Sequence, residues 1–148
     1  MSNDKLKDML VADLGGKGEI TEFLSEVVVT ITSKELLDLA NKLKSDKYDF
    51  DFLVNLTAVD FEENFTVVYN FRSLSNKTKL VLRVVISKEE PSLPSVIGIW
   101  KTADWQEREV FDLLGIIFTG HPELHRILLA DDFEGYPLRK DYKFDSRR

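Results

Sequence analysis

The sequence has 148 residues, 43% of them hydrophobic, which predicts one domain that buries a core of its own. It carries 26 acidic against 20 Lys and Arg side chains, a net charge of -6, which argues against a nucleic acid or an anionic membrane surface as the main partner. It has no cysteine, which excludes disulfides, cysteine nucleophiles, thiolate zinc sites and all-cysteine iron–sulfur ligation.

The first residues carry no targeting pattern and lead directly into a helix. Met1 to Lys5 lack the apolar stretch of a secretory signal, and no apolar run approaches the roughly 20 residues that cross a bilayer, so we expect a soluble chain without a membrane span. Apolar side chains recur at helical spacing from Leu6 to Leu14, and the run from Gly15 to Gly18 predicts the end of that helix. This glycine run lacks the spacing and the Ser or Thr of a phosphate-binding loop.

A buried strand and a second helix follow. The run from Val27 to Ile31 is almost entirely β-branched, which is typical of a buried strand. Thr32 and Glu35 have the spacing of a capping box, in which each side chain binds a backbone N–H at the start of a helix. Apolar residues at helical spacing continue this helix to about Ser45.

Three alternating runs occupy the middle of the chain. Their apolar positions have the two-residue period of strands with one covered face, and short polar turns separate them. The runs contain, in order, Phe50, Phe52, Val54, Leu56 and Ala58; Phe65, Val67, Tyr69 and Phe71; and Leu80, Leu82, Val84 and Ile86. Such a series predicts an antiparallel meander.

A last helix and an irregular C-terminal segment complete the chain. The helix is predicted from about Thr102 to Leu114, with Gly115 ending it and with either Thr102 or Asp104 capping its start. The order of elements predicts an α+β fold of two layers, a mixed or antiparallel sheet with helices on one face. Residues 1–130 are expected to form this domain, and residues 131–148 an extended tail that docks on a partner subunit.

Few residues have the pattern of a catalytic or metal site. His121 and His125 are the only histidines, Pro122 lies between them, and two ligands do not make a zinc site, so no metal site is predicted. The serines lie at the ends of predicted elements and lack the pattern of a nucleophile. A pair of carboxylates such as Glu107 and Asp131 stays open as a catalytic alternative, because spacing in sequence does not give spacing in the fold.

The last helix carries an unusual charge pattern. Asp104, Arg108 and Asp112 are four residues apart, which places one arginine between two carboxylates on one helix face. The spacing alone favours a solvated stripe of ion pairs that contributes a few tenths of a kcal/mol per pair. The alternative is a polar face desolvated against a partner, where losing one member would cost several kcal/mol.

Residues 104–142 hold a dense series of charged residues, glycines and prolines. Its members are Asp104, Glu107, Arg108, Glu109, Asp112, Gly115, His121, Pro122, Leu124, Arg126, Gly135, Pro137, Leu138, Arg139, Lys140 and Asp141. An E-R-E sequence followed by an acid and a glycine, a His-Pro step and a final G-x-P-L-R-K-D resemble the signature of the C subunit of proton-translocating NADH–quinone oxidoreductase, respiratory complex I. Phe111 changes the register of the first motif slightly, and His125 departs from the expected pattern and receives no role.

The resemblance implies a non-catalytic subunit of the peripheral arm, in a complex that transfers electrons from NADH to quinone and translocates protons. It implies that this chain binds no flavin, cluster or quinone, whereas the complex as a whole contains FMN, iron–sulfur clusters and quinone. The implied partners are the large subunit of the quinone-reducing module (the D-type subunit) and other hydrophilic-arm subunits. The implied location is the cytoplasmic side of the cell inner membrane, as a peripheral protein, and the motif residues would form the interface with the partners.

Three other functions stay open at this point. One is the equivalent subunit of a related membrane-bound hydrogenase, or of a dehydrogenase complex with another electron donor. The second is a free-standing enzyme with paired carboxylates, and the third is a soluble adaptor that belongs to no membrane complex.

Overall fold

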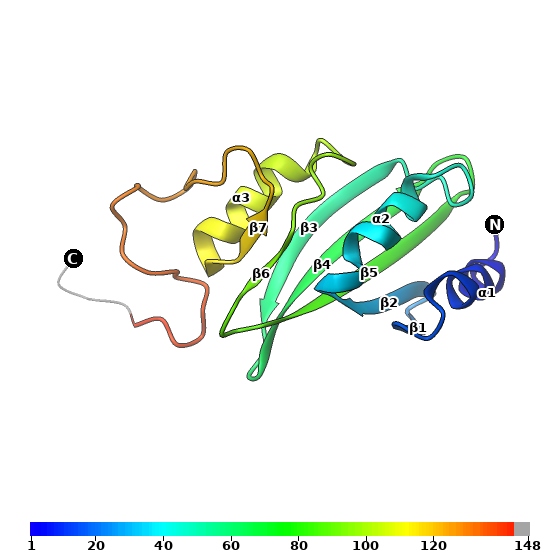
Figure 1. The fold of residues 1–148 in the computed structure, drawn as a ribbon, viewed down its shortest axis with the longest axis horizontal. Coiled ribbons are helices and arrows are strands. Elements are labelled where there is room, and N and C mark those ends of the chain that lie inside the picture. Colours follow the sequence, from blue (N-terminus) through cyan, green and yellow to red (C-terminus); the bar gives the residue numbers. More distant parts are fainter. Residues whose placement is uncertain (144–148) are drawn as a thin grey trace.

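A five-stranded mixed sheet is the largest element of the computed structural model, which describes residues 1–143 (Figure 1). Its strand order is β1-β2-β5-β4-β3, and β2 and β5 are its one parallel pair. The strands are β1 (Glu19–Phe23), β2 (Glu26–Thr32), β3 (Phe52–Asp60), β4 (Asn64–Ser73) and β5 (Thr78–Ser87). The predicted antiparallel meander is therefore confirmed as β3, β4 and β5.

Three α-helices and a two-stranded parallel sheet accompany this main sheet. They are α1 (Asn3–Leu14), α2 (Leu36–Lys44), α3 (Ala103–Leu114), β6 (Ser92–Pro94) and β7 (Ile117–Thr119), and the short 3-10 helix η1 (Ser33–Glu35) precedes α2. In the described residues, no helix has the length and the apolar content needed to cross a bilayer. The last five residues of the predicted tail, 144–148, lie outside the described residues.

The predicted burial is right for β4 and β5 and wrong in part for β3. In β4 and β5 all the predicted inward residues are buried. In β3 a bulge between Leu53 and Asn55 shifts the alternation, so Phe52 is 48% exposed and Val54 also points to solvent. Leu53 is buried in their place, whereas Leu56 is buried as predicted. A bulge adds one residue to a strand, so side chains before and after it follow opposite alternations. The pattern of apolar residues in the sequence did not reveal this bulge.

The N-terminal elements follow the prediction with two corrections. α1 ends at Gly15, which adopts the left-handed conformation with φ 56°. β1 was not predicted, because most of its residues are exposed and show no apolar alternation. The capping box does not form as predicted: the Thr32 hydroxyl bonds the Glu35 carboxylate itself, η1 occupies the first turn, and α2 begins at Leu36.

One face of the sheet is covered and the other is open. α2 crosses the front of β4 and β5 in Figure 1, and the apolar sides of α1 and α2 join the core over the inward residues of the strands. No described element covers the opposite face, where Glu26, Val28, Val81 and Asn70 are partly accessible. The two-layer α+β prediction, with helices on one face of a mixed sheet, is thus confirmed.

α3 lies along the edge strand β3 and supplies polar partners to that edge. The Leu56 N–H donates to the Gln106 side chain, and the Thr102 hydroxyl donates to the Leu53 carbonyl over 3.3 Å. An edge strand otherwise leaves such groups unpaired, so α3 completes the sheet at this side. Neither predicted cap forms, because the Thr102 hydroxyl is used on β3 and Asp104 lies inside the first turn of the helix.

Candidate partner-docking site

The charged residues of α3 do not pair with one another, contrary to the solvated stripe that their spacing favours. Asp104 lies beside His121, Arg108 donates to His125, and Asp112 pairs with Arg126. Each contact joins α3 to the loop after β7 instead of joining two turns of α3. Because Arg108 and Asp112 are buried, the stripe is also not solvated.

Asp112 organises the loop over residues 126–129. Its Oδ2 accepts three consecutive backbone N–H groups, at 3.2 Å from Ile127, 2.7 Å from Leu128 and 3.0 Å from Leu129. Its Oδ1 lies 3.2 Å from Nη1 of Arg126, and the side chain is fully buried. Successive N–H groups that converge on one anion form a nest, so this carboxylate fixes the path of the loop.

Glu107 joins α3 to the segment that follows β6. Its two oxygens accept the Ser95 hydroxyl and, over 3.0 Å, the Val96 N–H, and its side chain has no exposed surface. Burial raises the pKa of this carboxyl, and the hydrogen bonds from Ser95 and Val96 oppose the rise. An enclosed carboxylate with both oxygens engaged has no room for a substrate, which removes Glu107 and the exposed Asp131 as a catalytic pair.

The substitution Glu107→Gln tests how much stability the folded chain loses by burying this carboxyl. The raised pKa means that the folded chain keeps the Glu107 proton at pH values where the unfolded chain has lost it. The contribution of this group to stability therefore falls as pH rises from about 4.5, the ordinary value, to the raised folded pKa, and it stays lower above that window. Gln at this position can still accept from Val96 and can donate to Ser95, so urea titrations should show the variant gaining stability over the wild type as pH rises.

Glu109→Gln is the matched control, because Glu109 is two residues away on the same helix and is exposed. Its free energy of unfolding should follow the wild type across the whole pH range. If the free energies of unfolding of Glu107→Gln and the wild type changed equally with pH, burial of the Glu107 carboxyl would not cost stability.

His121 closes the N-terminal end of the site. Its buried ring places Nε2 2.9 Å from Asp104 Oδ1 and 3.3 Å from the Asp104 carbonyl oxygen, and its Nδ1 accepts the Glu123 N–H. Both ring nitrogens are thus engaged within the chain, which gives His121 a structural role. Within residues 1–143 there is no group of three or more His, Asp or Glu side chains that could hold a metal ion.

Arginines and aromatic rings alternate along the C-terminal segment. The Tyr136 ring lies between two guanidinium groups, 5.0 Å from Arg126 and 4.8 Å from Arg139. Arg126 also faces Phe133 at 5.6 Å, and Arg139 faces Phe65 of β4 at 5.4 Å. Because Phe65 belongs to the sheet, this stack fixes the segment to the domain.

The same segment binds the C-terminal end of α3. The Leu138 N–H donates to the Leu113 carbonyl over 3.0 Å, and Arg139 Nε donates to the Leu114 carbonyl over 2.7 Å. These carbonyls are among the four that a helix end leaves unpaired, and the arginine also complements the negative end of the helix dipole. The predicted tail is thus anchored on its own domain over residues 136–140, and its docking on a partner stays a prediction.

Asp60 holds the far end of this anchored segment. Its Oδ2 accepts the Lys140 N–H over 2.8 Å, and its other oxygen pairs with Lys88. Burial opposes ionisation of Asp60, but the Lys88 ammonium and the Lys140 N–H outweigh it and lower the pKa of the carboxyl. The carboxylate therefore stays charged at neutral pH and ties the tail to the end of β3.

Gly115 is the turn that allows the tail to approach α3. Its φ of 75° is left-handed, and an added Cβ would lie 2.7 Å from both Arg139 Nη2 and the Tyr136 ring. Gly115→Ala should cost about 2 kcal/mol, since the left-handed backbone alone costs an alanine about 1–2 kcal/mol. Hydrogen exchange should also become faster at the Leu138 and Arg139 amides.

Gly98→Ala is the matched control, because an added Cβ there meets nothing within 4 Å. This control should stay within about 0.5 kcal/mol of the wild type. Equal effects of the two substitutions would show that the tail does not rest on Gly115.

The anchored loops leave three large apolar side chains exposed around α3. Trp105 is 60% exposed, Leu128 59% and Leu138 58%, and the Arg108 guanidinium lies 4.6 Å from the Trp105 ring. We call the exposed residues Trp105, Glu109, Leu128 and Leu138, together with the largely buried Arg108 that contacts the Trp105 ring, the α3 docking surface. Tryptophan and arginine are the residue types that most often anchor protein interfaces.

The structure divides the predicted site residues into two groups. Those that are buried or partly buried are Asp104, Glu107, Arg108, Asp112, Gly115, His121, Arg126, Pro137 and Arg139, while Glu109, Pro122, Gly135, Leu138, Lys140 and Asp141 are exposed. Sequence reasoning missed Trp105, Ser95 and Asp60. Trp105 precedes Arg108 by one helical turn, which was the available signal for their stacking.

Comparison with known proteins gives a consistent result. The family model for the respiratory-chain NADH dehydrogenase 30 Kd subunit matches residues 29–148. The C subunit of NADH-quinone oxidoreductase from Geotalea uraniireducens is 42% identical over 84% of this chain and 77% of its own length. The protein of the same name from Roseiflexus sp. is 44% identical over 81% of this chain and 71% of its own length.

Two solved structures share the fold. A trypsin-resistant fragment of Nqo5 has a TM-score of 0.72 at 29% identity, covering 81% of this chain and 99% of that chain. A chain of the archaeal membrane-bound sulfane sulfur reductase has a TM-score of 0.79 at 23% identity, covering 94% of this chain and 86% of that chain. The second likeness concerns the fold alone.

Proposed function

Because the chain belongs to the family of the 30 kDa subunit of respiratory-chain NADH dehydrogenase, we propose that its α3 docking surface binds the large subunit of the quinone-reducing module. The chain is a non-catalytic subunit of the peripheral arm of NADH–quinone oxidoreductase. The equivalent subunit of a hydrogenase or of another dehydrogenase complex is not favoured, since the relatives of higher identity carry the NADH–quinone oxidoreductase name.

The exposed tryptophan of the α3 docking surface is the observation that supports this partner contact best. Trp105 stands on a helix whose Asp104, Arg108 and Asp112 all have partners within the chain, yet its own ring stays 60% exposed. Asp112 and Glu107 hold the surrounding loops in place, which lowers the entropy that a partner would lose in ordering them. A rigid aromatic anchor beside an arginine is the usual centre of a tight interface.

The chain is proposed to contribute no cofactor ligand to the complex. Its lack of cysteine removes the thiolates that hold most iron–sulfur clusters, so FMN, the clusters and quinone would be bound by other subunits. It is further proposed to lie on the cytoplasmic side of the cell inner membrane, as a peripheral protein held by its partner subunits.

Affinity isolation of the tagged full chain from gently solubilised membranes tests this function. Recovery of the large quinone-module subunit with NADH-binding subunits is the expected result. Recovery of a nickel–iron hydrogenase set would favour the related complex, and recovery of the chain alone at high yield from the soluble fraction would favour an adaptor.

A further inference from the structure

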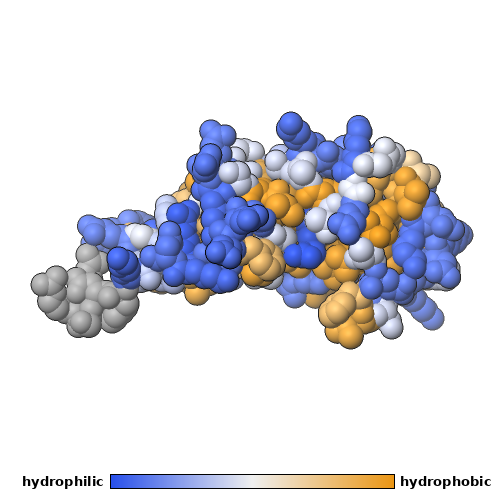
Figure 2. Space-filling model, turned by 90° about the horizontal axis from the view of Figure 1, so that it is seen from below, coloured by the Kyte–Doolittle hydropathy of each residue, from blue (hydrophilic) through white to orange (hydrophobic). Residues whose placement is uncertain are grey.

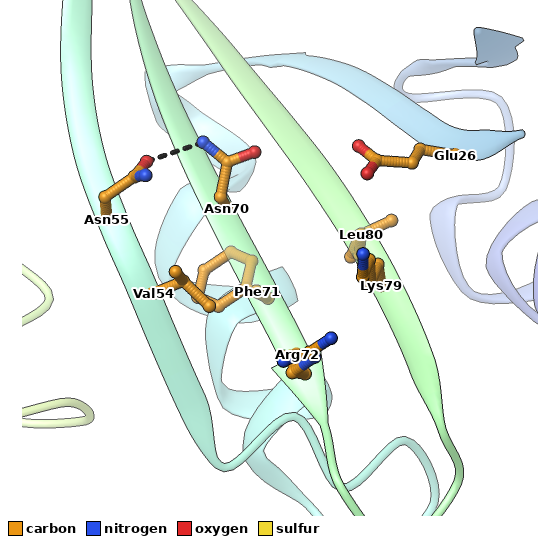
Figure 3. A pocket seen from close by; sticks show the side chains of 8 residues that line it. All are labelled: Glu26, Val54, Asn55, Asn70, Phe71, Arg72, Lys79 and Leu80. Carbon is orange, nitrogen blue, oxygen red and sulfur yellow. Dashed lines mark hydrogen bonds between the residues drawn. The ribbon is translucent and has the colours of Figure 1, made fainter. Parts of the chain in front are cut away.

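The open face of the sheet carries a regular arrangement of side chains that the contacts around α3 do not use. Val28 of β2 pairs with Val81 of β5, which in turn is opposite Asn70 of β4, and Asn70 is opposite Asn55 of β3. These residues form one row across the sheet, apolar at β2 and β5 and amide-bearing at β4 and β3. Asn70 donates to Asn55 over 2.6 Å, so the two amides are fixed relative to each other (Figure 3).

A second row beside the first contains two unpaired cations. Arg72 of β4 lies directly opposite Lys79 of β5, and Phe52 of β3 lies opposite Arg72 on the other side. In the described residues neither cation has a hydrogen bond or an ion pair within the chain, although Glu26 begins β2 next to Lys79. Like charges directly opposite each other destabilise a sheet, so folding alone does not explain this pair.

A shallow hollow of about 330 Å³ opens between the two rows. Figure 3 shows the amides of Asn55 and Asn70 at one end of it and Arg72 and Lys79 at the other. The hollow thus presents N–H donors and two cations against a single carboxylate, Glu26, which forms no ion pair with either of them, in a chain whose net charge is -6. A carboxylate is the group that this combination would bind.

The same face extends toward the β1–β2 turn through Phe23, which lines a second hollow with Val28 and Val81, and the exposed Leu24 follows it in the turn. Phe23 is 68% and Leu24 82% exposed, and Leu24 and Ser25 both adopt the left-handed conformation, with φ of 49° and 65°. Asn and Gly are the usual residues at such a tight turn, and a leucine there is strained and gains nothing from solvent. In Figure 2 hydrophobic residues gather over the sheet part of the molecule, while the end that carries the C-terminal segment is mainly hydrophilic.

We propose that the open face is a second protein-docking surface, occupied by a segment of a neighbouring subunit that bears carboxylates between apolar side chains. The carboxylates would lie at Arg72 and Lys79, and the apolar side chains over Val28, Val81 and the Phe23–Leu24 turn. A small anion would satisfy the cations alone, whereas the apolar residues on both sides of them call for a polypeptide. This surface rests on the proposed function, because it requires the chain to be part of a complex, and it lies on the face of the sheet opposite α2.

Cross-linking from the open face tests this surface, and the absence of native cysteines makes the labelling specific. Purified Val81→Cys protein is labelled with a benzophenone maleimide, added to membranes from cells that lack this subunit, and irradiated. A cross-link to a neighbouring subunit at a segment rich in Asp or Glu is expected. The double variant Arg72→Glu with Lys79→Glu should reduce the cross-link yield about tenfold or more, since like charges at an interface cost several kcal/mol.

The control variant Lys5→Glu with Lys17→Glu changes the net charge equally at exposed positions outside the open face and should leave the yield unchanged. A cross-link to a second copy of the chain, or one that the Arg72 and Lys79 reversal does not alter, would overturn the proposal. The proposal would also be overturned if no cross-link formed from position 81 while the same label at position 105 still formed one to the large subunit. That result would leave the proposed function standing. The absence of any cross-link from both positions would overturn both proposals.

Discussion

Replacing Asp112 by alanine is expected to destabilise the folded chain by about 3–5 kcal/mol, the range for a buried ion pair that loses one partner. The substitution removes the acceptor of three backbone N–H groups and of the Arg126 guanidinium at once. Urea unfolding should show a lower midpoint with an unchanged slope. Amide exchange at Ile127, Leu128 and Leu129 should accelerate more than in the sheet.

Asp131→Ala is the matched control, because Asp131 is an exposed acid a few residues from the loop. Its free energy of unfolding should stay within about 0.5 kcal/mol of the wild type. Asp112→Asn should fall between the two, since one oxygen remains to accept while the charge is lost. An Asp112→Ala variant within about 1 kcal/mol of the wild type would show that the loop does not depend on this carboxylate.

Trp105→Ala is expected to have the largest effect on assembly, weakening the binding of the subunit to its complex by about 2–4 kcal/mol, or roughly 30- to 1000-fold. The ring is mostly exposed in the chain, so its loss should change the free energy of unfolding little. It also removes the ring that lies 4.6 Å from the Arg108 guanidinium, while the hydrogen bond from Arg108 to His125 remains. The fraction of the chain that stays on washed membranes measures the effect.

Val11→Ala on α1 is the matched control for Trp105→Ala, because Val11 is also 60% exposed and lies far along the chain from α3. The control should be retained on the membranes at the wild-type level. Trp105→Phe should restore part of the retention, since it keeps an aromatic face. Full retention of Trp105→Ala would exclude the ring as the anchor.

The sheet could be predicted from the sequence wherever one face of a strand is buried. β5 alternates throughout, and β4 alternates except at the buried Thr66, because their inward side chains join the core while the outward ones meet the open face. β1 was missed because a mostly exposed edge strand has no such alternation. The error in β3 has a different cause: a bulge is a backbone feature, and Val54 is as apolar as the residues that are buried.

The motif of the C-terminal region identified important residues without giving their roles. Asp112 was expected to pair along α3 with Arg108, yet its partners come from residues 126–129. Those contacts depend on how the chain returns after β7, which helical spacing cannot show. The Lys140–Asp60 hydrogen bond spans 80 residues and is equally beyond local patterns. Burial of Glu107 could not be inferred either, because a glutamate on a helix is usually exposed.

Photo-cross-linking from position 105 in the assembled membrane complex tests most directly whether the α3 docking surface meets the large quinone-module subunit. Trp105 is replaced by a benzophenone-bearing amino acid, which keeps an aromatic side chain at the exposed position, and the irradiated membranes are analysed by mass spectrometry. A cross-link to the large quinone-module subunit is the predicted result. Cross-links only to other proteins, or none from a chain that is retained in the complex, would contradict the docking of this surface on that subunit.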